Sequence, residues 1–364
     1  MDEQLILGVL AITLGVVVGV LLFVPFVALS YRRRGGFGLG RFMLWGAAFG
    51  SFLAIWICAL LPLPDPGTIV CASANVEVTV IADHVRTAVM RRRGGAAATD
   101  PALQLLLSML LFVPLGFLLR VLGGRGVTTA LVAGLLLSGF IEVTQLTGVW
   151  GLYPCAYRAF DVGDLLANTL GAVLGSLLAL AVPRRRRGSP RMPGAEPPQP
   201  VTRGRRLLGM LCDALAAWVL GLTVMVAVQL FLYLLGADAA VRDGTAAALI
   251  GSVVPIAVWL VVTLATGGTI GDHTAQLRFA GGELPVPLAR FLRFIGGIGG
   301  YLVLMALPGA WAYVASVFAT VSLALVFLTD RGRGLPGVVS GQRLGDARER
   351  GESDAAPPGS ASAQ

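Results

Sequence analysis

The chain is built around apolar runs of about 20 residues, the length that a helix needs to cross the hydrocarbon core of a bilayer. Only 13% of its 364 residues are charged and 56% are hydrophobic, whereas an average soluble domain is about 25% charged. Because a chain in lipid must satisfy its backbone polar groups internally, the runs predict an all-α polytopic membrane bundle of about nine transmembrane helices. The runs are Leu5–Leu29, Leu44–Leu63, Ala102–Leu119, Val127–Leu146, Val162–Val182, Leu207–Leu235, Ala246–Ala265 and two within Phe291–Leu328, divided at Pro308 and Gly309.

The basic residues lie in groups beside these runs, a pattern typical of membrane topology rather than of nucleic-acid binding. If the helices alternate in direction, the arginines at 32–41, 120–125, 184–187 and 331–333 share one side. The positive-inside rule then predicts a multi-pass cell-membrane protein with its N-terminus outside and its C-terminus in the cytoplasm. Arg91–Arg93, in the long loop Asp65–Pro101, are then predicted to lie outside, which disagrees with this rule. The first run follows acidic residues and exceeds a signal-peptide core in length, so we expect it to remain as a helix.

Composition changes twice outside the apolar runs. Residues 183–202 are rich in Pro and Arg and have little apolar bulk, which predicts a solvated cytoplasmic linker. Residues 341–364 are rich in Gly, Ala, Ser and Pro and are predicted to be disordered. We therefore expect a five-helix membrane domain at 1–182, the linker, a four-helix membrane domain at 203–340 and the tail.

The four cysteines divide between spans and loops. Cys58 and Cys212 lie within apolar runs, where a thiol behaves as a small apolar group. Cys71 and Cys155 fall in the two loops predicted to lie outside, which is the oxidising side in bacteria. The topology therefore predicts a disulfide between Cys71 and Cys155.

A group of polar residues interrupts the fourth and fifth apolar runs. Charged and amide side chains at membrane depth are costly, so they mark a functional site or a lock between helices. Asp164 and Asn168 share one helical stripe with Gly171 and Gly175, and small residues at this spacing allow close helix approach. We expect all six polar residues to meet at the outer leaflet. They are Glu142, Gln145, Arg158, Asp161, Asp164 and Asn168.

Three interpretations of this group remain open. It forms a structural hydrogen-bond network, or it binds a polar envelope ligand such as a lipid headgroup or a peptidoglycan-precursor fragment, or its carboxylates hold a divalent cation. Neither His nor Cys joins the carboxylates, so we expect no metal and no cofactor. The only histidines, His84 and His273, lie beside no candidate Ser or Cys in sequence. No catalytic constellation therefore indicates an enzyme.

The motifs of the first half resemble a known family. Phe112-x-Pro-Leu-Gly-Phe precedes Glu142-x-x-Gln145, and the Asp164-x-x-x-Asn168-x-x-Gly171 stripe follows. Over about Phe42 to Val182 the chain resembles the VanZ-like family, bacterial membrane proteins named for an accessory factor in teicoplanin resistance. The insert Gly148–Tyr157, which carries Cys155, departs from the family's shorter spacing. The resemblance implies a role in the envelope or in glycopeptide tolerance.

The second half carries its own charged residues near or within spans. Arg206 and Asp213 lie two turns apart on one helical face, and a Gly-rich turn, Gly267–Gly271, follows two spans later. Over about Arg203 to Leu344 the chain looks like the RDD family, small membrane domains named for one Arg and two Asp. Arg206 and Asp213 match the first two residues, and Asp330 is the candidate for the second Asp. A charge pair that fixes helix packing is the alternative interpretation.

Three classes of function follow from the sequence. The first is an envelope or glycopeptide-tolerance factor that binds a lipid or cell-wall precursor headgroup at the outer leaflet. The second is an ion or small-solute transporter, because charged residues occur in spans of both halves and RDD-like proteins have been linked to cation exchange. The third is a membrane scaffold without chemistry. The lipid bilayer is the expected partner in each case, and no nucleic acid is expected.

Overall fold

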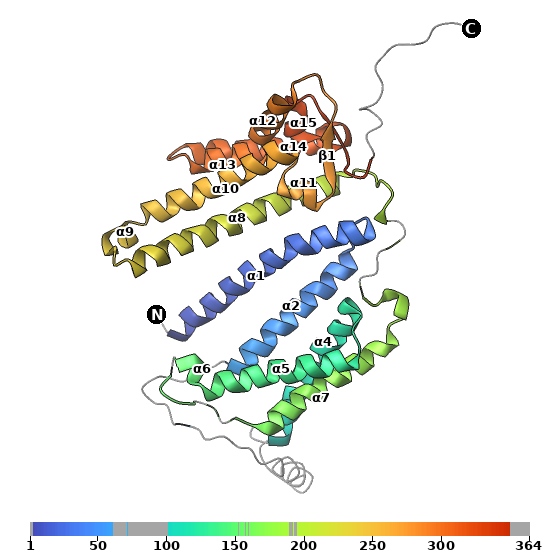
Figure 1. Ribbon diagram of the computed structural model, residues 1–364, viewed down its shortest axis with the longest axis vertical. Coiled ribbons are helices and arrows are strands. Elements are labelled where there is room, and N and C mark those ends of the chain that lie inside the picture. The colour runs from blue at the N-terminus through green and yellow to red at the C-terminus, as the bar shows by residue number, and fades with distance from the viewer. Residues whose placement is uncertain are drawn as a thin grey trace, which may run out of the picture. The chain divides into compact units, whose positions relative to one another are not determined.

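The computed structural model describes residues 3–60, 71, 101–151, 153–156, 158, 160–188, 192 and 195–349, and these are almost entirely helical (Figure 1). Within them, seven helices are long and apolar enough to cross a membrane, or eight if α12 and α13 form one bent span. Helix α1 (Glu3–Arg34), which covers the first predicted span, is not among the helices counted here. The expectation of an all-α polytopic membrane protein is confirmed.

Contacts between Cα atoms divide the chain into two compact units. The first unit comprises residues 1–12 and 38–190, and the second comprises residues 13–37 and 191–364. Most of α1 therefore groups with the C-terminal half of the chain rather than with the helices that follow it in sequence. Most of the predicted loop Asp65–Pro101, including Arg91–Arg93 and His84, lies outside the described residues.

The first unit is a helical bundle in which each long helix follows one of the predicted apolar runs. Its longest helices are α2, α4, α5 and α7, and short helical turns follow α5 and α7. The elements are α2 (Leu39–Leu60), α4 (Pro101–Gly123), α5 (Val127–Leu146), α6 (Gly148–Gly151), α7 (Val162–Leu178), η2 (Ala179–Ala181) and η3 (Arg184–Arg186).

Helices α4 and α7 meet backbone to backbone because glycines line their contact. A methyl group added at Gly171 would lie 2.0 Å from the Met109 carbonyl oxygen, and one at Gly175 would lie 1.9 Å from that of Val113. Gly116 on α4 completes the contact, since a methyl there would lie 1.7 Å from the Ala172 carbonyl oxygen. The glycine stripe expected from the sequence therefore faces α4, the helix before α5 in the chain.

Arginine side chains close one end of the first unit. Arg41 Nη2 donates to the carbonyl oxygens of Gly188 at 2.6 Å and Leu122 at 3.1 Å. Arg120 Nη1 donates to the Ser176 carbonyl oxygen at 3.0 Å. Guanidinium groups here meet carbonyl groups at or near the ends of helices, where the helix dipole favours positive charge. The start of the predicted linker is thus held on the bundle, and it is not a freely solvated segment.

The second unit contains the remaining helices and a small sheet. It begins, after residues 13–37, with the last residues of the predicted linker. The elements are α8 (Arg203–Leu234), α9 (Asp238–Asp243), α10 (Thr245–Thr266), α11 (Ile270–Thr274), β1 (Leu277–Ala280), α12 (Val286–Gly296), α13 (Ile298–Ala306), α14 (Trp311–Leu328), η5 (Asp330–Gly332), α15 (Gly334–Val339) and β2 (Arg343–Asp346).

The eighth predicted span is a broken helix. Helices α12 and α13 are bent by 55° at a break that falls at Gly297. A methyl group at Gly300 would lie 1.9 Å from the Ile295 carbonyl oxygen, so the glycines after the break allow the two segments to fold closely against each other. The sequence predicted the division at Pro308 and Gly309, which separate α13 from α14, but it did not predict this second break.

The predicted disordered tail contributes a strand to the second unit, so its expected start at residue 341 is wrong. Strand β2 pairs antiparallel with β1, with Leu277 opposite Asp346 and Phe279 opposite Leu344. Leu344 and Asp346 are almost fully buried. The composition of residues 341–364 concealed this strand because only four residues take part. Residues 350–364 lie outside the described residues.

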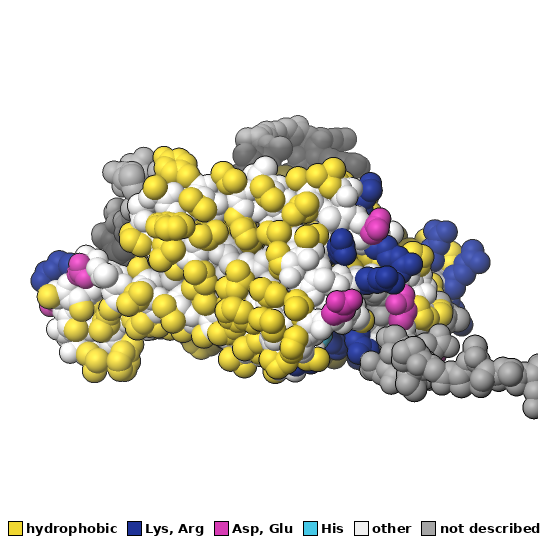
Figure 2. Space-filling model, turned by 90° about the horizontal axis from the view of Figure 1, so that it is seen from above, with side chains coloured by type: hydrophobic (Ala, Val, Ile, Leu, Met, Phe, Trp, Pro, Cys, Tyr) yellow, Lys and Arg dark blue, Asp and Glu magenta, His cyan; other side chains and the backbone are white. Residues whose placement is uncertain are grey.

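Hydrophobic side chains cover most of the face visible in Figure 2, and charged side chains gather toward its ends. The exposed apolar residues include Leu211, Val261, Val317 and Leu328 on three different long helices. Such extensive apolar exposure is what lipid contact requires of a membrane-spanning surface.

Candidate functional site

Five of the six polar residues singled out in the first half line one pocket, with a volume of about 760 Å³. We call it the Glu142 pocket. It lies between α2, α4, α5 and α7, and its size falls in the range of about 300–1,000 Å³ typical of small-ligand sites. Its polar lining residues are Cys58, Gln104, Ser108, Glu142, Gln145, Arg158, Asp164 and Asn168.

Glu142 and Asp161 link the end of α5 to the start of α7. The Asp161 backbone N–H donates to Glu142 Oε2 at 3.0 Å. The Asp161 side chain caps α7 by accepting from the Gly163 N–H at 2.7 Å, as an Asp at a helix start commonly does. Asp161 therefore orders the helix start and does not itself line the pocket, while only 3% of the Glu142 surface is exposed.

Asp164 and Asn168 each bring a buried oxygen atom with no hydrogen-bond partner to the pocket. The Asp164 carboxyl bonds to Ser108, and Asn168 Nδ2 donates to Ser138 Oγ at 2.9 Å. Asp164 Oδ1 and Asn168 Oδ1 remain without a partner among the described residues. Unsatisfied buried polar atoms are rare and costly, so these two oxygens mark the part of the pocket that a ligand or water would complete.

Gln145 and Arg158 play different parts in the same pocket. Gln145 is buried, and its Nε2 donates to the Ala59 carbonyl oxygen at 2.7 Å, which ties α5 to the last turn of α2. Arg158 is exposed at the pocket rim, and its charge acts on both Glu142 and Asp164. The pocket thus combines two carboxyl groups with one guanidinium group.

The contribution of α4 to the pocket was not predicted from the sequence. Gln104 and Ser108 line the pocket beside the α5 and α7 residues. They lie four positions apart in an otherwise apolar run and so share one helix face. That spacing is the signal that would have identified them.

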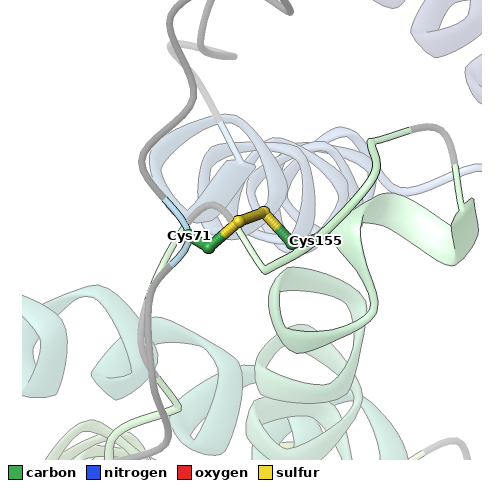
Figure 3. Close-up of a disulfide and its surroundings, with 2 residues drawn as sticks. All are labelled: Cys71 and Cys155. Atoms are coloured by element: carbon green, nitrogen blue, oxygen red, sulfur yellow. A yellow bond between two sulfur atoms is a disulfide. The ribbon is translucent and has the colours of Figure 1, made fainter.

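A disulfide joins Cys71 to Cys155, with their Cα atoms 5.6 Å apart (Figure 3). This is the pair expected from the topology. Cys155 follows a left-handed turn, α6, in which Val149 and Trp150 both have positive φ angles. Gly148 allows the turn to close, because a methyl group there would lie 2.6 Å from the Cys155 carbonyl oxygen.

The comparison with protein families agrees with this geometry. Residues 49–183 match the VanZ/LLP1 family model. The chain therefore contains a VanZ-like domain that includes the whole Glu142 pocket, and its limits lie close to the resemblance expected from the sequence. Neither the curated proteins nor the solved structures include a match to the chain. The comparisons give no support to the RDD-like resemblance of the second half.

Arg206 and Asp213, the charged residues singled out in the second half, bond to other residues and not to each other. Arg206 forms an ion pair with Asp272, at the start of α11. Asp213 accepts hydrogen bonds from Trp259 Nε1 at 2.8 Å, Thr269 Oγ1 at 2.5 Å and the Gly271 N–H at 2.7 Å. Both carboxylates are buried, so each is satisfied within the protein.

Among the described residues, Asp330 takes no part in that arrangement. Its side chain is exposed in η5, whereas the carboxylate at Arg206 belongs to Asp272. Asp272 could have been noticed in the sequence, because Thr269-x-x-Asp272 has the spacing of a capping box. Both hydrogen bonds of that box are present. Among the described residues, no group of three or more His, Cys, Asp and Glu side chains could hold a metal ion.

Proposed function

We propose that the VanZ-like domain binds the polar headgroup of a bilayer amphiphile in the Glu142 pocket, and that it acts as an envelope or glycopeptide-tolerance factor. The observation that supports this is the pair of buried acceptor oxygens, Asp164 Oδ1 and Asn168 Oδ1, on the wall of a pocket of about 760 Å³. A purely structural network would use these atoms to join α5 to α7.

The pocket's chemistry favours a headgroup that donates hydrogen bonds. Glu142, Asp164 and Asn168 offer acceptors, so ammonium and hydroxyl groups suit them. Arg158 at the rim is placed for a phosphate, which guanidinium groups bind well. Leu103 and Leu107, on the pocket wall, are exposed on α4, and they offer apolar surface for an attached chain. A lipid or a lipid-linked cell-wall precursor has all three features.

We propose further that the pocket opens toward the outer leaflet. The arginine groups of the first unit support this orientation through the positive-inside rule, and the disulfide at Cys155 is compatible with an oxidising compartment. In this orientation the bridge ties the loop that carries Cys71 to the segment between α5 and α7.

Two substitutions at one position test the proposal. The purified full-length protein in detergent is titrated with dihexanoyl phosphatidylethanolamine, whose ammonium group donates hydrogen bonds, and with dihexanoyl phosphatidylcholine, whose headgroup does not. We expect the first lipid to bind more tightly. Asp164→Asn should weaken binding less than Asp164→Leu, because an amide still forms hydrogen bonds.

The matched control is the same pair of changes at Asp238, an exposed residue on α9. Growth of a deletion strain on teicoplanin, complemented with each variant, gives the cellular readout. A muramoyl-pentapeptide fragment serves as the second probe and separates a precursor from a lipid. If Asp164→Leu binds both probes and complements as well as the Asp238 control, the domain is a scaffold and the proposal fails.

The transporter alternative rests on charge buried in both halves and on the RDD-like resemblance, which we keep as a proposal for Arg206 and Asp213. It is decided by ion or solute flux in proteoliposomes. Flux lost in Asp213→Asn but retained in Asp164→Leu would assign transport to the second half alone.

A further inference from the structure

The second unit contains a separate cavity of about 520 Å³ that neither the family match nor the Glu142 pocket accounts for. We call it the Arg293 cavity. One end is polar and is formed by α8, α11, β1 and α12. The other end is apolar and is lined by Leu211 on α8, Tyr301 on α13, and Phe318 and Leu323 on α14.

Arg293 is the decisive residue at the polar end. Only 5% of its surface is exposed, yet Nε and Nη1 have no hydrogen-bond partner among the described residues. An unpaired buried guanidinium group is far more costly than an unpaired hydroxyl. The Thr263 and Ser322 hydroxyl groups, also buried on the cavity wall, likewise find no hydrogen-bond partner in the described part of the chain.

The charges around Arg293 leave a positive excess. Arg206 and Arg293 both lie 5.3 Å from the centre of the Phe279 ring, and Arg290 is close enough to Arg293 to act on its charge. Asp272 also acts on the charge of Arg293, but it is paired with Arg206, and Asp213 takes its hydrogen bonds from neutral groups. Three guanidinium groups therefore face two carboxyl groups, which leaves one positive charge.

Gly267 keeps the guanidinium groups accessible from the cavity. It has a φ of +79°, and a methyl group there would lie 3.3 Å from both Arg290 Nε and Arg293 Nη2. Glycine thus leaves open the space beside Arg293, which lines the cavity, and beside its neighbour Arg290. An anionic group in that space would receive charge-assisted hydrogen bonds.

We propose that the Arg293 cavity binds an anionic amphiphile, with its acid group at Arg293 and its apolar chain between α8, α13 and α14. The polar end supplies unpaired donors and positive charge, and the other end supplies an apolar wall. A small inorganic anion would leave that wall empty, and a neutral lipid would leave the guanidinium group unpaired. A fatty-acid carboxylate and a lysophospholipid phosphate share the required chemistry.

A photoreactive oleate with a mid-chain diazirine tests this proposal on the full-length protein in a non-ionic detergent. Crosslinks are mapped to peptides, and unlabelled competitors are oleate, 1-oleoyl-lysophosphatidylglycerol, oleyl alcohol and acetate. We expect crosslinks on α8, α13 or α14, and competition by the two anionic amphiphiles at concentrations at least about tenfold below those of oleyl alcohol. The tighter of the two identifies the acid as carboxylate or phosphate.

Variants at both ends of the cavity complete the test. Arg293→Gln should weaken oleate binding about tenfold or more, while Arg242→Gln on α9, an exposed arginine, should not. Ala319→Leu narrows the apolar end, and Ala312→Leu is the same change on α14 away from the cavity. This second pair decides the matter if Arg293→Gln does not fold. Equal competition by oleyl alcohol and oleate, or equal binding by the two α14 variants, would overturn the proposal.

Discussion

The Asp346 carboxylate lies 2.8 Å from the Arg205 guanidinium group and joins the last strand of the second unit to the first turn of α8. Asp346 also pairs with Arg348 at 2.9 Å and accepts from the Gln199 N–H at 3.0 Å. Arg205 in turn stacks on Tyr31 of α1, with 5.2 Å to the ring centre. One buried carboxylate thus orders the end of the predicted linker, α8 and the strand pair.

Asp346→Asn should destabilise the protein by about 3 kcal/mol or more, because it leaves Arg205 buried without a counter-charge. Burial alone would raise the pKa of Asp346, but hydrogen bonds from Arg348, Arg205 and Gln199 outweigh it, so the pKa lies below its usual value. A lowered pKa in the folded state stabilises the protein above the unfolded-state pKa of about 3.9. That stabilisation is lost as pH falls further, through the folded-state pKa.

The measurement is the thermal unfolding midpoint in detergent at several pH values from neutral to about 3. The difference in unfolding midpoint between wild type and Asp346→Asn should be largest near neutral pH and should become smaller below about pH 4. Asp243→Asn, at an exposed position on α9, is the control, and its unfolding midpoint should not differ from that of wild type. A difference in midpoint between wild type and Asp346→Asn that stays constant down to the lowest pH would show that the charge of Asp346 does not stabilise the fold.

Gly171→Ala should destabilise the VanZ-like domain, because the new methyl group would lie 2.0 Å from the Met109 carbonyl oxygen and would force α4 and α7 apart. We expect a loss of roughly 1–3 kcal/mol, typical of overpacking. Gly139→Ala on α5 is the matched control, since its methyl group would meet only Leu165, at 3.9 Å. The unfolding midpoints of the two variants in detergent should differ, and equal midpoints would rule out the close helix contact.

Thiol labelling should find two free cysteines in the unreduced protein and four after reduction. Cys71 and Cys155 are bridged, and Cys58 and Cys212 are free. Alkylation under denaturing conditions, with and without prior reduction, is read out by mass spectrometry. Cys155→Ser should lower stability by about 3–5 kcal/mol, given a sequence separation of 84 residues. Four labelled thiols without reduction would exclude the bridge.

Reporter fusions after Arg34, Pro190 and Glu349 should all report cytoplasm if the predicted orientation holds. The last site follows β2, because a fusion at Gly341 would remove the strand that holds Asp346. A fusion in the outer loop after Cys71 should give the opposite signal. A periplasmic signal at Pro190 would overturn the orientation of the whole first half.

Local sequence patterns predicted most of the helices because each span carries its own apolar run. They also predicted that Glu142, Asp164 and Asn168 would share one site, since costly side chains on neighbouring spans must face inward. The three line one pocket, but they bond to Asp161, Ser108 and Ser138 rather than to one another.

What the sequence did not predict depends on pairing between distant segments. Asp346 looks like an ordinary acid of a polar tail until the fold brings it to Arg205. Asp272 has the spacing of a capping box, but that spacing does not predict its ion pair with Arg206. Arg293 lies at the end of an amphipathic helix, where a solvated arginine is the usual expectation. Its guanidinium group lies against Phe279 and Gly267, which come from other elements, and a local pattern in the sequence does not reveal such contacts.

The strand pair has a consequence for how the protein is made. The guanidinium group of Arg205 receives its carboxylate partner from a residue 141 positions later in the chain. While the intervening helices are being synthesised and inserted, the guanidinium group of Arg205 has to remain hydrated or pair with another acidic group. The first turn of α8 therefore acquires this ion pair only after the ribosome has passed codon 346.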